Sequence, residues 1–222
     1  MPPAPPTSGS AQAAPTPPLI WLASYPRSGN TMLRTIMYQC FGVRSASIYP
    51  RDVRGRVEQH IGHVEHGPNR QINLTGERFW LIKTHGQPQD NRRSIYVLRN
   101  GREATLSYYR FLHGQVPLQD IVEGRGRQPS WATHLEQWNP LARAGTLVLR
   151  YEEMTADLGG TIDAIAGFLD AEPRARSLPD RETLADGQWI VSAHAEKARF
   201  DTAAEAAFER INGEQMRRYG YR

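Results

Sequence analysis

Residues 24–31 have the composition of an anion-binding loop: Ser-Tyr-Pro-Arg-Ser-Gly-Asn-Thr. They follow the apolar run 19–23, which predicts a short buried strand. They precede the run 32–41, whose apolar residues recur at helical spacing up to Gly42. Backbone N–H groups at a helix N-terminus have no partner within the helix and point at any anion placed there. The segment therefore predicts a phosphate-binding loop between a strand and a helix.

The loop keeps the length of the Walker-type nucleotide loop, G-x-x-x-x-G-K-[ST], but departs from its residues. Gly29 and Thr31 occupy the second glycine and the hydroxyl position. Ser24 replaces the first glycine and Asn30 replaces the lysine, and the cation is instead Arg27 in mid-loop. Because a neutral amide cannot neutralise a γ-phosphate, we expect an anhydride with less terminal charge than a metal-bound triphosphate.

Polar side chains also lie at or after the ends of three further apolar runs, 79–83, 94–98 and 146–151, which are predicted strands. These side chains are Lys83, Thr84, His85, Arg99, Ser107 and Tyr151. The carboxyl ends of parallel strands lie along one edge of a sheet, so we expect these groups to converge there. Such a gathering of cations, hydroxyls and a histidine is typical of a site that transfers an anionic group.

Strands alternate with helices along the chain. Helices are expected at 32–41, 102–111, 131–142, 158–170 and 202–219, and loops at 44–78 and 113–130. This alternation predicts an α/β fold of the three-layer P-loop type, with a central parallel sheet flanked by helices.

The length of 222 residues predicts one domain, 19–222, after a disordered Pro/Ala-rich tail, 1–18. The formal charge of +4 suits an anionic ligand. Cys40 is the sole cysteine, and its helical spacing favours a buried thiol. No basic residue precedes Arg27 and no apolar stretch reaches membrane-spanning length. We therefore expect a cytoplasmic protein without a signal peptide or membrane contact.

Four segments together resemble soluble, cytosolic-type sulfotransferases that use 3′-phosphoadenosine 5′-phosphosulfate (PAPS), in a compact, bacterial-like form. They are Tyr-Pro-Arg-Ser-Gly-Asn-Thr (25–31), Lys-Thr-His (83–85), residues 96–109 with Arg99 and Ser107 eight apart, and Leu-Arg-Tyr-Glu-Glu-Met (149–154). Ser130-Trp131, His134, Trp138 and the ending Tyr219-Gly220-Tyr221 are also similar to family segments. The segments occur in the family's order, which is more specific than any one of them.

The resemblance implies transfer of a sulfonate from PAPS to a hydroxyl or amine of a small-molecule acceptor, leaving adenosine 3′,5′-bisphosphate (PAP). His85 would be the general base, and Lys83 would assist at the sulfonate. Arg27 would hold the bridging and sulfonate oxygens. Fixed cations and loop dipoles would neutralise the charge, so no metal is required.

The resemblance also implies a set of donor-binding residues: Arg27, Ser28, Gly29, Asn30, Thr31, Met32, Arg99, Ser107 and Tyr151. The loop would bind the 5′-phosphate, Arg99 and Ser107 the 3′-phosphate, and Tyr151 the adenine edge. Met32 stands where the family usually has an aromatic residue against adenine. The stretch 192–200 lacks the basic Arg-Lys-Gly loop of the family and offers Lys197 and Arg199 instead.

Two other classes stay open at this point. A P-loop kinase-like phosphotransferase would share the loop, although Asn30 argues against it. A non-catalytic polyanion or nucleic-acid binder would suit the basic charge, but the arginines are not interleaved with aromatic residues, so no nucleic acid is expected.

Two further groups of side chains are not expected to belong to a functional site. Trp131, His134 and Trp138 recur at helical spacing and are expected to be core residues. The trio His60, His63 and His66 is interrupted by glycines and has no cysteine, so a metal site is not expected.

Overall fold

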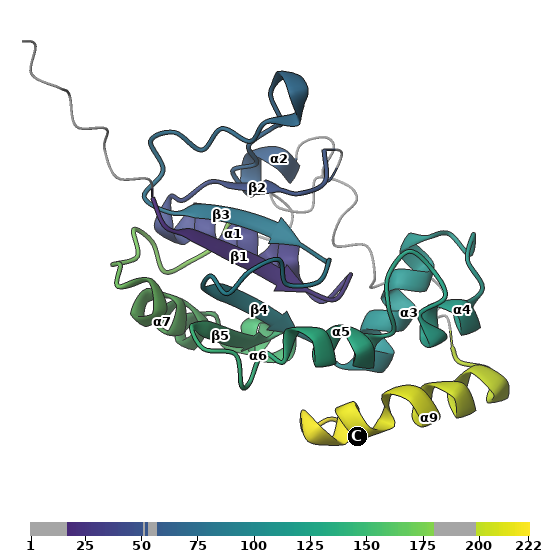
Figure 1. Cartoon of the computed structure of the whole chain (residues 1–222). Helices are drawn as coiled ribbons and strands as arrows, with labels where there is room; N and C mark the ends of the chain where they lie inside the picture. Colours follow the sequence, from purple (N-terminus) through teal and green to yellow (C-terminus); the bar gives the residue numbers. More distant parts are fainter. Residues whose placement is uncertain (1–16, 51, 53–56, 180–198) are drawn as a thin grey trace, which may run out of the picture.

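The computed structural model describes residues 17–50, 52, 57–179 and 199–222. Its centre is a five-stranded sheet in the order β2-β3-β1-β4-β5, in which every neighbouring pair is parallel (Figure 1). The strands are β1 (Leu19–Ser24), β2 (Ser45–Ser47), β3 (Trp80–Thr84), β4 (Ser94–Leu98) and β5 (Thr146–Arg150). Ala23 of β1 lies opposite Thr84 of β3 and Tyr96 of β4, so the ends of these strands reach one edge together. The predicted α/β fold with a central parallel sheet is confirmed.

Helices cover both faces of the sheet (Figure 1). Alternate β1 residues divide between two cores, since Ile20 and Leu22 face one side and Trp21 and Ala23 the other. The first side is covered by α1 (Asn30–Phe41), α6 (Tyr151–Ala156) and α7 (Leu158–Leu169). The second is covered by α3 (Gly101–Phe111), α4 (Leu118–Glu123), α5 (Trp131–Trp138) and α9 (Thr202–Arg218). The result is the expected three-layer arrangement.

The two predicted loop regions contain short elements that the residue pattern does not reveal. The region 44–78 includes β2, α2 (Val57–His60) and the 3-10 helix η1 (Pro68–Arg70), and 113–130 includes α4. Strand β2 is only Ser-Ala-Ser, without apolar alternation. Its extended form depends on pairing with β3, a partner distant in sequence.

Two element boundaries differ from expectation. The helix expected over 131–142 ends at Trp138, because Asn139 takes a left-handed conformation (φ 39, ψ 54) immediately before Pro140. Tyr151, expected to end a strand, instead begins α6, so its ring is presented beyond the strand end.

Several side chains are buried as expected: Cys40, Trp131, His134 and Trp138. Residues 1–16 and 180–198, which include most of the expected tail and Lys197, lie outside the described residues. None of the helices in the described part of the chain is long and apolar enough to cross a membrane.

Candidate active site

The loop between β1 and α1 leaves the N-terminus of α1 open to an anion. Ser28 N–H donates to the carbonyl of Tyr25 (3.3 Å), while Arg27 (φ 64) and Gly29 (φ 106) take left-handed conformations. Among the described residues, no side chain caps the helix at Gly29. The first-turn amides of α1 therefore have no internal partner and carry the positive end of the helix dipole.

Tyr151 and Arg99 tie this loop to the ends of β5 and β4. A Cβ atom on Gly29 would lie 2.4 Å from Tyr151 Cδ2, so the ring lies directly against the loop backbone. The Arg99 guanidinium lies 4.4 Å from the Tyr151 ring centroid, and its Nη1 donates to the carbonyl of Arg27 (2.9 Å). Three strand ends thus meet around one loop.

Arg27, Arg99 and Ser107 gather at the start of this loop. Arg27 Nε lies 3.4 Å from Ser107 Oγ, and its guanidinium lies 5.1 Å from the exposed ring of Phe111. Burial and the charge of Arg99 lower the pKa of Arg27. Glu103 lies 4.0 Å from Arg99 Nη2. Because like charges held together disfavour one another, an anion bound between the two arginines would relieve the repulsion.

The other loop residues differ in what they can offer an anion. The side-chain amide of Asn30 donates to the Leu22 carbonyl (2.8 Å) and to Ser24 Oγ (3.3 Å), so it is directed into the fold and its backbone N–H is its available donor. Ser28 is buried, and its hydroxyl has no hydrogen-bond partner within the described ranges. Thr31 and Met32 are half-buried.

His85 follows β3 and is held in one tautomer. Its Nδ1 lies 2.8 Å from the carbonyl oxygen of Ser24, which can only accept, so Nδ1 carries the proton and Nε2 the lone pair. Burial, followed by the charge of Lys83, lowers the pKa of His85 well below its ordinary value. A neutral imidazole with an available Nε2 is the form that accepts a proton.

Tyr49, which no pattern in the sequence marks, also contacts His85. Its hydroxyl accepts a hydrogen bond from the backbone N–H of His85 (3.1 Å), and its ring stacks on the imidazole with centroids 6.0 Å apart. Lys83 Nζ lies 5.4 Å from the Tyr49 ring centroid. The charge of Arg27 makes a small contribution to lowering the pKa of both Lys83 and His85.

The backbone after His85 is supported by α5. Trp138 Nε1 donates to the carbonyl of Gly86 (2.8 Å), and His134 Nδ1 lies 2.7 Å from the hydroxyl of Tyr96 on β4. Two of the three side chains expected in the core, His134 and Trp138, therefore contact the middle of β4 and the backbone that follows β3.

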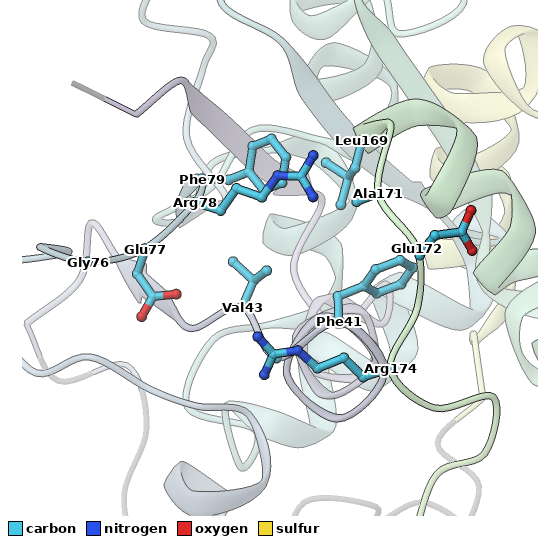
Figure 2. A pocket seen from close by; sticks show the side chains of 11 residues that line it. Phe41, Val43, Gly76, Glu77, Arg78, Phe79, Leu169, Ala171, Glu172 and Arg174 are labelled. Atoms are coloured by element: carbon cyan, nitrogen blue, oxygen red, sulfur yellow. The ribbon is translucent and has the colours of Figure 1, made fainter. Parts of the chain in front are cut away.

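A cavity of about 270 Å³ lies at the opposite end of the fold from these groups. Figure 2 shows Arg78 and Arg174 on opposite sides of it. Arg78 donates to the carbonyl of Asp170 at the C-terminus of α7 (2.8 Å), and the backbone N–H of Arg174 donates to the carbonyl of Cys40 near the end of α1 (2.6 Å). These hydrogen bonds satisfy carbonyl groups at the C-terminal ends of α7 and α1. The arginines that line the cavity therefore have a structural role.

Two of the three histidines of the trio also have structural partners. His63 Nδ1 lies 2.8 Å from Arg34 Nη2, and His66 Nε2 donates to the Ser47 carbonyl (2.8 Å). Within the described ranges, no three metal-ligating side chains lie together.

Comparison with known proteins identifies the family. The model of the sulfotransferase domain family matches residues 17–186. The chain belongs to the sulfotransferase domain family. It is 26% identical to mouse Sulfotransferase 1E1 over 184 residues (72% of this chain, 61% of the relative) and 31% identical to human Sulfotransferase 2B1 over 168 residues (68% and 46%). The chain spans about six-tenths of the length of the first relatives it matches.

Solved structures agree on the fold. Mouse sulfotransferase SULT7A1 complexed with PAP superposes with a TM-score of 0.59 at 18% identity, covering 90% of this chain and 85% of that one. Retinol dehydratase in a complex with retinol and PAP gives a TM-score of 0.51 at 19% identity, covering 77% and 63%. These structures confirm the fold, and the family model confirms the resemblance to sulfotransferases that the four sequence segments predict.

Proposed function

We propose that this protein transfers a sulfonate group from PAPS to a hydroxyl or amine of a small-molecule acceptor. The observation that carries the proposal is the neutral His85, whose Nε2 has no partner among the described residues and which lies on the sheet edge that also bears Arg27 and Arg99. Family membership supports the reaction class, and two structures that share the fold were solved with PAP, the product of this donor.

The donor would bind along the β1–α1 loop. The open amides of residues 29–32 suit the 5′-phosphate, with Asn30 contributing its backbone rather than its side chain. In this proposal Arg99 and Ser107 would bind the 3′-phosphate and Tyr151 the edge of the base. The contacts of Ser107 with Arg27 and of Arg99 with the Tyr151 ring support this assignment. Thr31 would add its hydroxyl and Met32 an apolar contact.

In the proposed step, His85 Nε2 takes the proton from the acceptor hydroxyl or amine as that atom attacks sulfur. The bond from sulfur to the bridging oxygen breaks, and its electron pair stays on the departing phosphate of PAP. Arg27 and Lys83 stabilise the negative charge that develops on the sulfonate and the leaving oxygen. The proposal uses fixed cations for this purpose and requires no metal.

Incubation of the purified protein with PAPS and a panel of hydroxyl and amine acceptors tests the proposal through PAP release and the sulfonated product. Calorimetric titration compares PAP with ATP and magnesium. We expect PAP to bind and at least one acceptor to be sulfonated. Magnesium-dependent ATP binding without PAP binding would instead indicate a kinase-like enzyme. Salt-dependent nucleic-acid binding without turnover would indicate a non-catalytic binder.

A further inference from the structure

A buried carboxylate, Asp52, lies between two cations next to the candidate site. One oxygen pairs with Arg34 Nη1 (2.9 Å) and the other with Lys83 Nζ. The side chains of Asp52, Arg34 and Lys83 are 6%, 2% and 12% exposed. Arg34 is held by Ser45 Oγ (2.7 Å) and His63 Nδ1 (2.8 Å), so the carboxylate is anchored to α1 and β2.

Lys83 connects the anchored carboxylate of Asp52 to Tyr49 and His85. The Lys83 ammonium is 5.4 Å from the ring centroid of Tyr49, the same ring that stacks on His85 and accepts its backbone N–H. A flexible lysine stem has several rotamers, and the ion pair with Asp52 selects the one that keeps the ammonium beside these two rings.

We infer that Asp52 is a positioning residue of the proposed sulfonate-transfer site: its carboxylate, anchored by Arg34, holds the Lys83 ammonium charged and in place beside Tyr49 and His85. The catalytic meaning of this inference rests on the proposed function, whereas the placement of the ammonium can be tested without turnover.

The charges around Lys83 explain why the carboxylate is needed. Burial lowers the pKa of Lys83, the charges of Arg34 and Arg27 lower it further, and Asp52 raises it. Among the described residues, the Tyr49 ring also lies near the ammonium, and the charge of Lys83 acts on His85. Without the negative charge, two buried cations would face each other, and Lys83 is the one that can lose its proton or swing away.

The kinetic test is Asp52→Asn. We expect kcat to fall about ten- to a hundredfold, because a group near the reacting atoms is displaced, while PAP affinity changes far less. The alkaline limb of the pH–rate profile should move to lower pH, because Lys83 loses its proton earlier. In Asp52→Asn/Lys83→Arg that shift should be absent, because a guanidinium does not titrate in this range. An unchanged pH profile in Asp52→Asn would overturn the inference.

A double variant, Arg34→Met/Asp52→Asn, controls for folding. It removes the buried guanidinium that Asp52→Asn alone would leave without its carboxylate. We expect its thermal midpoint to exceed that of Asp52→Asn while the loss of kcat persists. Recovery of wild-type kcat in the double variant would show that Asp52 serves only to neutralise Arg34, and the inference would be wrong.

Amine labelling supplies a readout that does not depend on turnover. Only two of the 27 basic residues are lysines, Lys83 and Lys197, so mass spectrometry can follow Lys83 relative to Lys197 during acetylation. In Asp52→Asn, the labelling of Lys83 should rise about tenfold for each unit by which its pKa falls. Unchanged labelling would refute the placement whatever the activity. Increased labelling in a protein that fails every PAPS assay would retain the placement and reject the proposed function.

Discussion

The Nδ1 atom of His85 donates a hydrogen bond to the backbone carbonyl of Ser24 over 2.8 Å. The bond joins the residue after β3 to the last residue of β1, the neighbouring strand. Because the carbonyl can only accept, this single contact decides which ring nitrogen bears the proton. The basic nitrogen is then Nε2, the atom that the proposed mechanism uses.

The variant His85→Asn should distinguish the structural role of Nδ1 from the catalytic role of Nε2. The amide of asparagine can replace Nδ1 as the donor to Ser24 but has no atom in the place of Nε2. We expect turnover to fall about 10²- to 10⁴-fold, the range for loss of a general base, with little change in PAP affinity. Steady-state kinetics and calorimetry measure the two quantities. Near-normal turnover would remove His85 from the mechanism.

The burial of His134 should make the fold sensitive to acid. Burial lowers the pKa of His134 from 6.5 to about 4, against a smaller opposing effect of the His85 backbone. Between pH 6.5 and pH 4, the His134 imidazole binds a proton in the unfolded chain but stays neutral in the folded chain. The free energy of unfolding should therefore decrease as the pH falls from 6.5 towards 4, by about 3 kcal/mol from this group.

Urea denaturation between pH 7 and pH 4.5 measures this effect, with His134→Gln as the control. His85 and His63 also have lowered pKa values, so the difference between the two proteins isolates His134. Identical pH dependence in both would contradict the prediction.

Arg99→Ala should weaken PAP binding about ten- to a hundredfold, the usual effect of removing a charged hydrogen bond to a phosphate. Adenosine 5′-monophosphate, which lacks the 3′-phosphate, should lose much less. Arg102→Ala is the matched control, because Arg102 lies only three residues further on, in the first turn of α3, but pairs with Glu205 and Glu209. Equal losses for both nucleotides would assign Arg99 to some other part of the site.

Gly29→Ala should cost both stability and donor affinity. The backbone at Gly29 has φ 106, and an added Cβ would meet the Tyr151 ring at 2.4 Å. We expect a loss of about 1–3 kcal/mol in the free energy of unfolding, together with weaker PAP binding as the ring is displaced. Gly76→Ala is the control, because Gly76 also has a positive φ (84) but nothing within 4 Å of the added Cβ.

Chemical denaturation and PAP titration of both alanine variants separate the cost of the positive φ, which both glycines share, from the steric contact with Tyr151, which only Gly29 has. The difference between them measures the contact with Tyr151. Equal destabilisation with PAP binding intact in Gly29→Ala would show that this ring does not shape the donor site.

Much of the fold and part of the candidate site follow from local sequence. The run 19–41 contains its own strand, glycine and helical periodicity, and these form β1, the loop and α1. Apolar runs likewise identify β3, β4 and β5, and so place Lys83, His85 and Arg99 at strand ends. These features depend on residues adjacent in the chain, which is why a single sequence is enough to predict them.

The tertiary structure alone decided which side chains these residues meet. Asp52 pairs with Lys83 across 31 residues, Tyr49 contacts His85 across 36, and Arg99 binds the Arg27 carbonyl across 72. Asp52 and Tyr49 come from a polar segment without periodicity, so no local signal marks them. Their contacts arise because β3 lies between β2 and β1, and the order of strands in a parallel sheet is set by packing between distant segments.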